Sequence, residues 1–182
     1  MRFQETKIAG VVVVEPDLLQ DERGFFTRIF CREEFRAQGL EDHLEQSSLS
    51  FNHKRGTVRG LHWQAAPHGE TKVVACVEGH IYDVAVDVRP NSPSFCQWVS
   101  VELSAANRRM LYLPKGIAHG FQTLEDASMV LYQISSAFHP EATRGVRWND
   151  PKLAITWPLG NDLTISDRDL HWPDWRSSGV RE

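Results

Sequence analysis

The chain has 182 residues, of which 41% are hydrophobic and 24% are charged, with a formal net charge of -4. This length is typical of one domain, and the hydrophobic fraction is large enough to form a core. The negative balance argues against a surface that as a whole binds nucleic acid or a membrane. We expect a single domain over residues 1–175, followed by a polar C-terminal tail over residues 176–182.

The N-terminal region gives no sign of targeting. Residues 1–10 include Glu5 and Lys7 and lack the apolar core of a signal peptide. The apolar run 11–14 is too short to span a bilayer, and we predict that it is a buried strand. The three cysteines are odd in number and widely spaced, without the pattern of a zinc site or a disulfide framework. Together these features predict a cytoplasmic protein.

The elements that follow are mostly strands. A short helix is predicted over residues 32–38, because Gly39 stands where a left-handed residue commonly ends a helix. Most of the remaining chain alternates with period two, which is typical of strands. The clearest runs are residues 81–88, 99–103, 111–113 and 129–135. Many short strands separated by turn residues predict a sandwich, jelly roll or barrel.

Two carboxylates interrupt one face of the apolar run 81–88. For Asp87 we predict a solvated position. For Asp83 two interpretations stay open, because this face could be solvated or could line a barrel interior that binds a polar ligand.

The segment Arg59-Gly60-Leu61-His62, followed by Lys72, places a possible base near a cation. A histidine can remove a proton near neutral pH. A lysine can stabilise the negative charge that the proton leaves behind. The pair therefore suits proton abstraction beside a carbonyl group, although a histidine near a lysine is also common on ordinary surfaces.

Downstream, Pro114-x-Gly116-x-x-His119 matches the second conserved motif of the cupin superfamily. The first cupin motif normally supplies two histidines and a glutamate to a metal ion. The matching stretch here contains His62, Gln64 and Glu70, and the second histidine is missing. A metal site formed by His62, Glu70 and His119 stays open as an alternative, but the incomplete motif favours a site without metal.

Several motifs occur along the chain in a specific joint order: Asp21-Glu22-Arg23-Gly24-Phe25-Phe26, Arg59-Gly60-Leu61-His62, Lys72, Pro114-x-Gly116-x-Ala118-His119-Gly120-Phe121, Leu131-Tyr132, Gly145-x-Arg147-Trp148-x-Asp150-Pro151 and Ser166-x-x-Asp169. By these motifs the chain resembles, from about residue 8 to residue 173, the dTDP-4-dehydrorhamnose 3,5-epimerase family of metal-free cupins. The resemblance implies an all-β fold, a cupin-type jelly-roll β-barrel with a few short helices. It also implies a homodimer whose N-terminal strands, for which the run 11–14 is a candidate, extend across to the partner sheet.

The implied activity is that of an isomerase without a cofactor, acting in L-rhamnose biosynthesis. Its partner would be a nucleotide-diphosphate 4-keto-sugar, dTDP-4-dehydro-6-deoxy-D-glucose, converted to dTDP-4-dehydro-L-rhamnose. By resemblance, His62 removes the protons from C3 and C5, and Asp169 orients its ring. Lys72 would stabilise the enolate oxygen, and Tyr132 would reprotonate from the opposite face.

Other matching positions imply contacts to the substrate. Arg23 and Arg59 would bind the diphosphate, for which a guanidinium is well shaped. His119 would contact the sugar or phosphate, and the ring of Phe138 would stack on the thymine base. The resemblance adds three further substrate-binding residues: Gln46, Ser48 and Arg168.

Plainer interpretations remain for several of these residues. His62 could be a polar residue at a strand end, Tyr132 a core residue, and Arg23 a turn residue. Asp169, in its Ser-x-x-Asp pattern, could cap a short helix. For the segment Trp172-Pro173-Asp174-Trp175, we predict packing rather than ligand binding.

The chain also departs from the family pattern. Arg28 and Thr143 stand where family members often carry substrate-contacting glutamates, and residues 47–49 replace a nucleotide-contacting triplet. None of these positions belongs to the proposed acid, base or enolate groups. Alternatives therefore stay open: epimerisation at a single carbon, or another nucleotide-linked 4-keto sugar. A metal-dependent cupin and a non-catalytic sugar-nucleotide binder are the competing classes.

Overall fold

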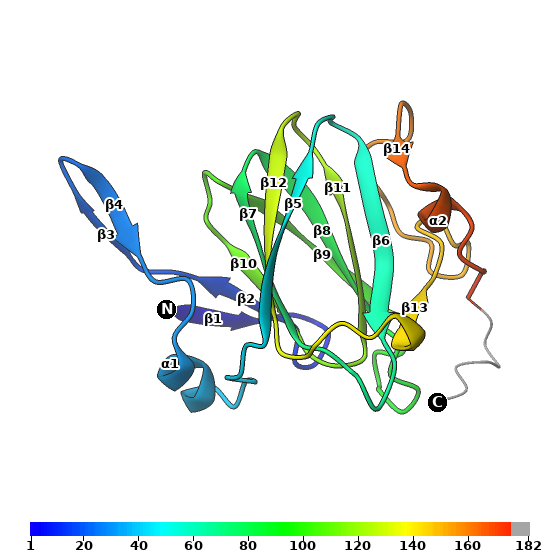
Figure 1. Cartoon of the computed structure of the whole chain (residues 1–182), viewed down its shortest axis with the longest axis horizontal. Coiled ribbons are helices and arrows are strands. Elements are labelled where there is room, and N and C mark those ends of the chain that lie inside the picture. Colours follow the sequence, from blue (N-terminus) through cyan, green and yellow to red (C-terminus); the bar gives the residue numbers. More distant parts are fainter. Residues whose placement is uncertain (176–182) are drawn as a thin grey trace.

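The computed structural model describes residues 1–175, and the predicted tail over residues 176–182 lies outside the described residues. In the described chain, two six-stranded sheets face each other in a jelly-roll barrel (Figure 1). The first sheet has the order β1 (Arg2–Glu5), β2 (Val12–Glu15), β10 (Met110–Leu113), β7 (Lys72–Glu78), β12 (Ser128–Ile134) and β5 (Gln46–Asn52). The second has the order β13 (Thr143–Gly145), β6 (Thr57–Gln64), β11 (Ile117–Thr123), β8 (His80–Asp87) and β9 (Trp98–Ser104), with β14 (Thr164–Ile165) parallel to β6. The predicted all-β jelly-roll class is confirmed.

The main core lies between the two sheets. Its side chains come from alternate positions of facing strands, as period-two patterning requires. They include Val74, Ile81, Leu111, Phe121 and Val130, all buried. Burying a side chain of this size contributes about 1.5–3 kcal/mol. The core fills one part of the barrel and leaves the other part to polar side chains.

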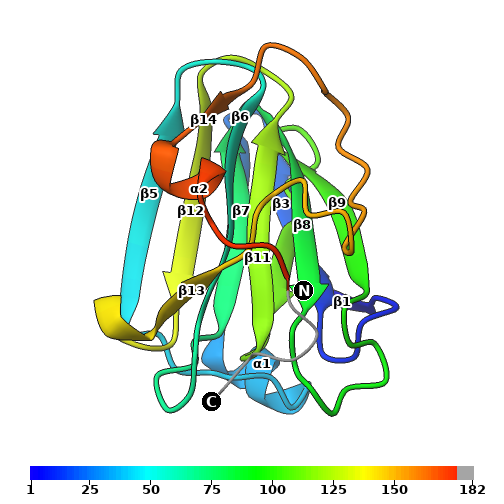
Figure 2. The same ribbon diagram turned by 90° about the vertical axis from the view of Figure 1, so that its right-hand side faces the viewer.

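Both sheets are also covered on their outer faces. The helix α1 (Arg32–Ala37) places Phe35 against the outer face of the first sheet. The chain after β13 crosses the outer face of the second sheet, where Leu153 and Trp175 are buried (Figure 2). Strand β8 is therefore buried on both faces.

The prediction of a solvated position for Asp87 was wrong, because this residue lies on the inner face of β8, the face that also carries the core residue Ile81. Asp87 is fully buried, and the turn that follows β8 folds back to supply its partners. Arg89 donates to its carboxylate at 2.7 Å, and the hydroxyls of Ser92 and Ser94 also donate. Burial favours the neutral acid, but these donors outweigh it and lower the pKa of Asp87 to about 2.

The predicted helix and its terminator are confirmed. Gly39 has φ +69°, a left-handed conformation that favours glycine. Its N–H donates to the carbonyl of Arg36, and the N–H of Leu40 donates to the carbonyl of Phe35, both at 3.0 Å. This pair of bonds is the Schellman motif, which satisfies carbonyl groups at the helix end.

The predicted strands appear with boundaries shifted by about one residue, as β2, β8, β9, β10 and β12. The run 11–14 is buried within the chain's own first sheet. The segment that projects from the barrel is instead the hairpin of β3 (Leu18–Asp21) and β4 (Gly24–Thr27) (Figure 1). Two short helices complete the fold, the 3₁₀ turn η1 (Pro140–Ala142) and α2 (Asp167–Leu170). Within the described part of the chain, no helix is long and apolar enough to cross a membrane.

Candidate active site

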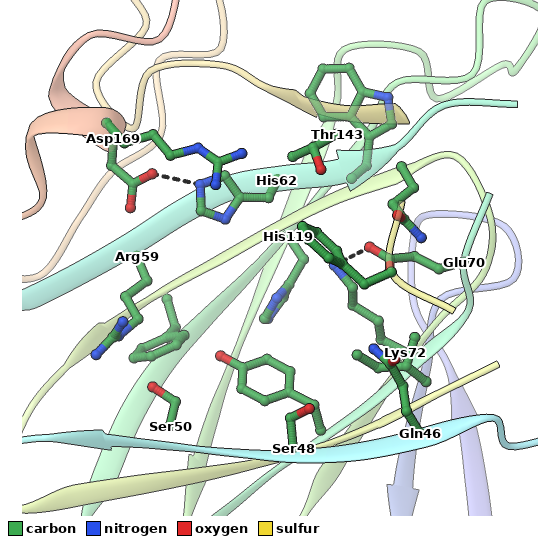
Figure 3. A pocket seen from close by; sticks show the side chains of 17 residues that line it. Gln46, Ser48, Ser50, Arg59, His62, Glu70, Lys72, His119, Thr143 and Asp169 are labelled. Carbon is green, nitrogen blue, oxygen red and sulfur yellow. Dashed lines mark hydrogen bonds and ion pairs between the residues drawn. The ribbon is translucent and has the colours of Figure 1, made fainter. Parts of the chain in front are cut away.

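A cavity of about 520 Å³ lies inside the barrel, lined by residues from both sheets (Figure 3). Its size is within the usual range for small-molecule sites. Ten of the eleven predicted site residues line it: Gln46, Ser48, Arg59, His62, Lys72, His119, Tyr132, Phe138, Arg168 and Asp169. The eleventh, Arg23, lies elsewhere.

His62 and Asp169 form a hydrogen-bonded pair at one wall. His62 Nε2 lies 2.6 Å from Asp169 Oδ1. The Asp169 side chain is 6% exposed, whereas that of His62 is 33% exposed and faces the cavity. The arrangement holds a reachable imidazole against a buried carboxylate.

Three donors converge on the Asp169 carboxylate: His62, the backbone N–H of Gly60 at 3.3 Å and the indole N–H of Trp172 at 3.2 Å. Burial alone would raise the pKa of Asp169, but these bonds and the charge of His62 lower it below its usual value. An ionised carboxylate only accepts hydrogen bonds, so Nε2 of His62 must carry the proton. In the neutral imidazole, the lone pair is then on Nδ1, which points into the cavity (Figure 3).

Local backbone geometry brings these groups together. A register irregularity between β6 and β11 lets both Arg59 and His62 face the interior, although strict alternation would place them on opposite faces. It occurs at Gly60, which has φ +110° and packs so closely on Gly120 that a Cβ would lie 2.6 Å from the Gly120 Cα. Only glycine fits there.

Helix α2 delivers the carboxylate. Ser166 is its N-cap, and the Ser166 hydroxyl accepts a hydrogen bond from the backbone N–H of Asp169. The Asp169 side chain is therefore free to bind His62. The short helix expected from the Ser-x-x-Asp pattern exists, but its cap is Ser166, so the interpretation of Asp169 as the capping residue is wrong.

Tyr132 lies on β12 of the opposite sheet. Its ring meets the ring of His119 edge-on, with centroids 6.0 Å apart. Burial, helped by the negative charge of Asp83, raises the pKa of Tyr132 well above its usual value, and Arg59 offsets this only in part. The phenol therefore keeps its proton at physiological pH.

Two further buried side-chain pairs include the cavity residues Lys72 and His119. Lys72 Nζ lies 2.6 Å from Glu70 Oε1, with both side chains largely buried. His119 Nε2 lies 2.7 Å from Asp83 Oδ1, and burial raises the pKa of Asp83 while His119 and Lys72 oppose the shift. Of the two interpretations of Asp83, the structure therefore supports the barrel interior.

The remaining polar wall comes from β5. Its alternate residues Gln46, Ser48 and Ser50 face the cavity opposite Arg59 on β6 (Figure 3). Arg59 Nε donates to Asn52 Oδ1 at 2.8 Å, which holds the guanidinium near the end of β5. The result is a cationic group bordered by hydroxyl and amide groups.

Two further cavity residues, Phe138 and Arg168, place an aromatic ring and a cation at the cavity. Phe138 is 57% exposed and leaves an open aromatic face. The guanidinium of Arg168 lies 5.1 Å from the ring centre of Trp172. An aromatic ring and a cation in these positions suit a base and a charged group of a nucleotide.

The structure does not bring every expected residue into the cavity. Arg23 lies on the projecting hairpin, 85% exposed, and pairs with Asp21 at 2.6 Å. Arg28 lies near the base of that hairpin, 3.6 Å from Glu34. Within one chain, neither residue lines the cavity.

The alternative metal site is not assembled. Its three candidate ligands each bind a separate partner: His62 with Asp169, Glu70 with Lys72 and His119 with Asp83. Among residues 1–175, no group of potential metal ligands close enough to hold an ion includes any of the three. Each of these side chains is engaged with its own partner instead.

The sequence analysis missed two residues of the site, Ser50 in the cavity wall and Trp172 beside the His62–Asp169 pair. Ser50 could have been found by extending the alternation of Gln46 and Ser48 along one strand. Trp172 was expected only to pack, yet it binds Asp169 and meets the His62 ring edge-on at 5.9 Å. No pattern in the sequence indicates that contact. The packing prediction does hold for Trp175, which is buried against Trp63 and Phe95.

Comparison with known proteins agrees with this geometry. The family model for dTDP-4-dehydrorhamnose 3,5-epimerase matches residues 5–177. A protein of that name from Methanothermobacter thermautotrophicus is 41% identical, with 98% of this chain and 97% of the relative covered. The crystal structure of the Bacillus anthracis enzyme, with TDP and PPi bound, has a TM-score of 0.92 at 39% identity and covers 96% of this chain and 99% of that one.

A structural neighbour of different specificity is also similar. The crystal structure of the 3'-monoepimerase from Streptomyces bikiniensis, in complex with dTDP-quinovose, has a TM-score of 0.87 at 34% identity. The match covers 94% of this chain and 86% of the epimerase chain. The fold is thus shared by enzymes that invert different numbers of centres. With a family match over nearly its whole length and a relative well above 30% identity, the chain belongs to the dTDP-4-dehydrorhamnose 3,5-epimerase family.

Proposed function

We propose that the chain converts dTDP-4-dehydro-6-deoxy-D-glucose to dTDP-4-dehydro-L-rhamnose by proton transfer at C3 and C5. The observation that carries this proposal is the placement of His62 and Tyr132 on facing sheets of one cavity. Inversion of a carbon requires that one group removes a proton and another returns one from the other side. A base and an acid on opposing walls meet that requirement.

The first step begins at His62. Its Nδ1 removes the proton from C3, and the bonding electrons move toward the C4 ketone to form an enolate. The imidazolium that results is stabilised by the Asp169 carboxylate at 2.6 Å. Lys72 has three N–H donors and gives one to Glu70, so the others can bind the enolate oxygen.

The second step uses Tyr132. The phenol donates its proton to C3 from the opposite face and restores the ketone with inverted configuration. Solvent then reprotonates the phenolate and accepts the proton from the imidazolium. The same sequence at C5, on the other side of the C4 ketone, completes the double epimerisation, and no cofactor is required.

The nucleotide half of the substrate is bound by the exposed end of the cavity. Arg59 suits the diphosphate, because a planar guanidinium can donate two parallel hydrogen bonds to phosphate oxygens. Phe138 offers its open ring to the base, and Arg168 adds positive charge to the cavity lining. Gln46 and Ser48 bind the sugar or nucleotide through their amide and hydroxyl groups.

We also propose a homodimer. The β3–β4 hairpin exposes Leu19, Phe25 and Phe26, which are 51–70% exposed. The edge strand β5 exposes Leu49 on its outer face, 64% accessible. Packing the hairpin of one protomer on the β5 edge of its partner would cover both surfaces and bring Arg23 toward the partner's cavity.

We further propose that residues 1–175 form the single domain that carries out this reaction. We also propose that the protein acts in the cytoplasm. Support for a reducing compartment comes from the cysteines, because Cys31, Cys76 and Cys96 are all free thiols.

A second candidate is inversion at C3 alone, favoured by the similarity to the Streptomyces bikiniensis 3'-monoepimerase. The two candidates are separated by NMR identification of the product from dTDP-4-dehydro-6-deoxy-D-glucose. The L-rhamno product supports double inversion, and a product inverted only at C3 supports the single epimerase. Binding of dTDP without any conversion would instead indicate a non-catalytic binder.

A further inference from the structure

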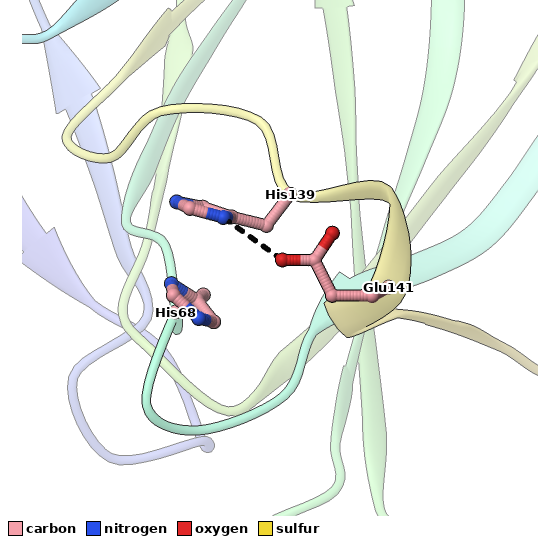
Figure 4. A group of neighbouring side chains, drawn as sticks. All are labelled: His68, His139 and Glu141. Atoms are coloured by element: carbon pink, nitrogen blue, oxygen red, sulfur yellow. Dashed lines mark hydrogen bonds and ion pairs between the residues drawn. The ribbon is translucent and has the colours of Figure 1, made fainter.

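A second cluster of potential ligands lies outside the residues of the catalytic cavity. His68, His139 and Glu141 each place one nitrogen or oxygen atom within 4.8 Å of the others (Figure 4). The two imidazoles stack at a centroid distance of 3.7 Å, and His139 Nδ1 lies 3.1 Å from Glu141 Oε1. The proton-transfer mechanism uses none of these side chains.

The cluster joins two loops that are held together from inside. His68 lies in the connection between β6 and β7, whereas His139 and Glu141 lie at η1. The Gln64 side chain is 3% exposed and binds both loops. Its amide nitrogen donates to the carbonyls of His68 and Ala137, and its oxygen accepts a 2.6 Å bond from the His139 N–H. The backbones that carry the two imidazoles are therefore fixed relative to each other.

The donor set has a defined chemical preference. Two neutral imidazoles and one carboxylate favour Co²⁺, Ni²⁺, Cu²⁺ or Zn²⁺ over Mg²⁺ and Ca²⁺, which prefer oxygen ligands. Bonds of about 2.0–2.1 Å in a tetrahedral site place ligand atoms roughly 3.3 Å apart. The three atoms lie within 4.8 Å of one another, and the side chains of Glu141 and His139, which are 68% and 34% exposed, have room to turn toward a shared ion.

We propose that His68, His139 and Glu141 bind one first-row transition-metal ion, with water completing its coordination. The bound ion would fasten the loop between β6 and β7 to the loop that precedes β13. Phe138 is adjacent to His139, and Glu70 follows His68 by two residues, so the ion would brace the wall of the cavity from behind. It would act on the stability of that wall and take no part in proton transfer.

The test is a titration of tag-free, chelator-stripped full-length protein with Co²⁺, followed by visible absorption and without any sugar nucleotide. We expect one ion per chain, with Zn²⁺ displacing it. His68→Ala and Glu141→Gln should each weaken Co²⁺ binding by roughly tenfold or more, since even indirect partners of a metal ligand contribute 10–100-fold to affinity. Co²⁺ should also raise the unfolding temperature of the wild type and not that of the variants.

His43 provides the matched control. His43 Nε2 lies 3.1 Å from Glu45 Oε2, a similarly exposed pair without a second imidazole. His43→Ala should leave Co²⁺ affinity unchanged. The proposal is overturned if the wild type binds Co²⁺ no more tightly than His68→Ala and Glu141→Gln, or if His43→Ala weakens binding as much. Because no substrate is present, the result is independent of the proposed reaction.

Discussion

The indole nitrogen of Trp172 donates a 3.2 Å hydrogen bond to Asp169 Oδ1, the same oxygen that binds His62. The tryptophan therefore fixes the carboxylate that fixes the base. Hydrogen bonds to a charged group contribute about 1.5–3 kcal/mol. A residue outside the acid–base pair thus sets the position of the catalytic imidazole.

Gly145 makes room for this tryptophan. It pairs with His62 across β13 and β6, and a Cβ at this position would overlap the indole ring of Trp172. Gly145→Ala should displace Trp172 and lower kcat by roughly tenfold or more, the kinetic equivalent of losing one such hydrogen bond. Steady-state kinetics and dTDP binding measure this effect. Gly160→Ala is the control, because a Cβ there meets open space, and equal kcat values for the two variants would contradict the role of Trp172.

Removing the Tyr132 hydroxyl should separate proton removal from inversion. In Tyr132→Phe, His62 can still remove and return a proton on its own face, so solvent exchange should continue while formation of inverted product falls roughly 10²–10⁴-fold. NMR in D₂O measures both quantities in one sample. Tyr132→Phe with normal inversion would exclude the phenol as the acid.

The pH dependence of the wild type gives a separate prediction. Because burial and the charge of Asp83 raise the pKa of Tyr132, the wild-type rate should not fall between pH 8 and about 10 through loss of this proton.

The buried Asp87 predicts a defined acid sensitivity. Its folded pKa of about 2 lies below its ordinary value of 3.8, so its stabilisation is present above about pH 4 and is lost as the pH falls through 2. The shift corresponds to a contribution of about 2 kcal/mol. Asp87→Asn should therefore lower the free energy of unfolding near pH 6, with a smaller difference near pH 2. The exposed Asp162→Asn is the control, and a constant deficit at every pH would argue against this account.

The proposed dimer predicts complementation between two defective chains. Arg23→Ala lacks the diphosphate contact that its hairpin would provide, and His62→Ala lacks the base. If Arg23 acts in the partner's cavity, a hybrid dimer contains one cavity with both groups intact. Hybrid dimers of one Arg23→Ala chain and one His62→Ala chain can be obtained by co-expression with a different tag on each chain. At low substrate concentration, these hybrids should be more active than either parent dimer. Activity no greater than the mean of the two parents would place Arg23 outside the partner's site.

The sequence predicted the fold well where period-two patterning is clean. The runs that became β8, β9, β10 and β12 are apolar on at least one face, so their alternation is visible. Strands β5 and β6 were not assigned separately, because their inward residues are mostly polar and line the cavity instead of filling a core. The solvated position predicted for Asp87 failed for a different reason, since no sequence pattern shows that the turn after β8 folds back and supplies Arg89 and Ser94 as partners for this carboxylate.

The site was predicted through motif resemblance more than through spacing. His62 and Asp169 are 107 residues apart, and only the fold brings them to 2.6 Å. The register irregularity at Gly60 cannot be deduced from alternation, yet it turns both Arg59 and His62 inward. The contact of Trp172 with Asp169 could not be predicted from the sequence either, because it depends on the short helix that positions Asp169.

The most direct test of the central claim is solvent exchange at the two carbons beside the ketone. Wild-type protein and His62→Ala would be incubated with dTDP-4-dehydro-6-deoxy-D-glucose in D₂O, and deuterium at C3 and C5 followed by NMR. The mechanism predicts deuterium at both carbons with the wild type and loss of both signals with His62→Ala, while dTDP binding is retained. Equal deuterium incorporation by His62→Ala and the wild type would show that His62 is not the base.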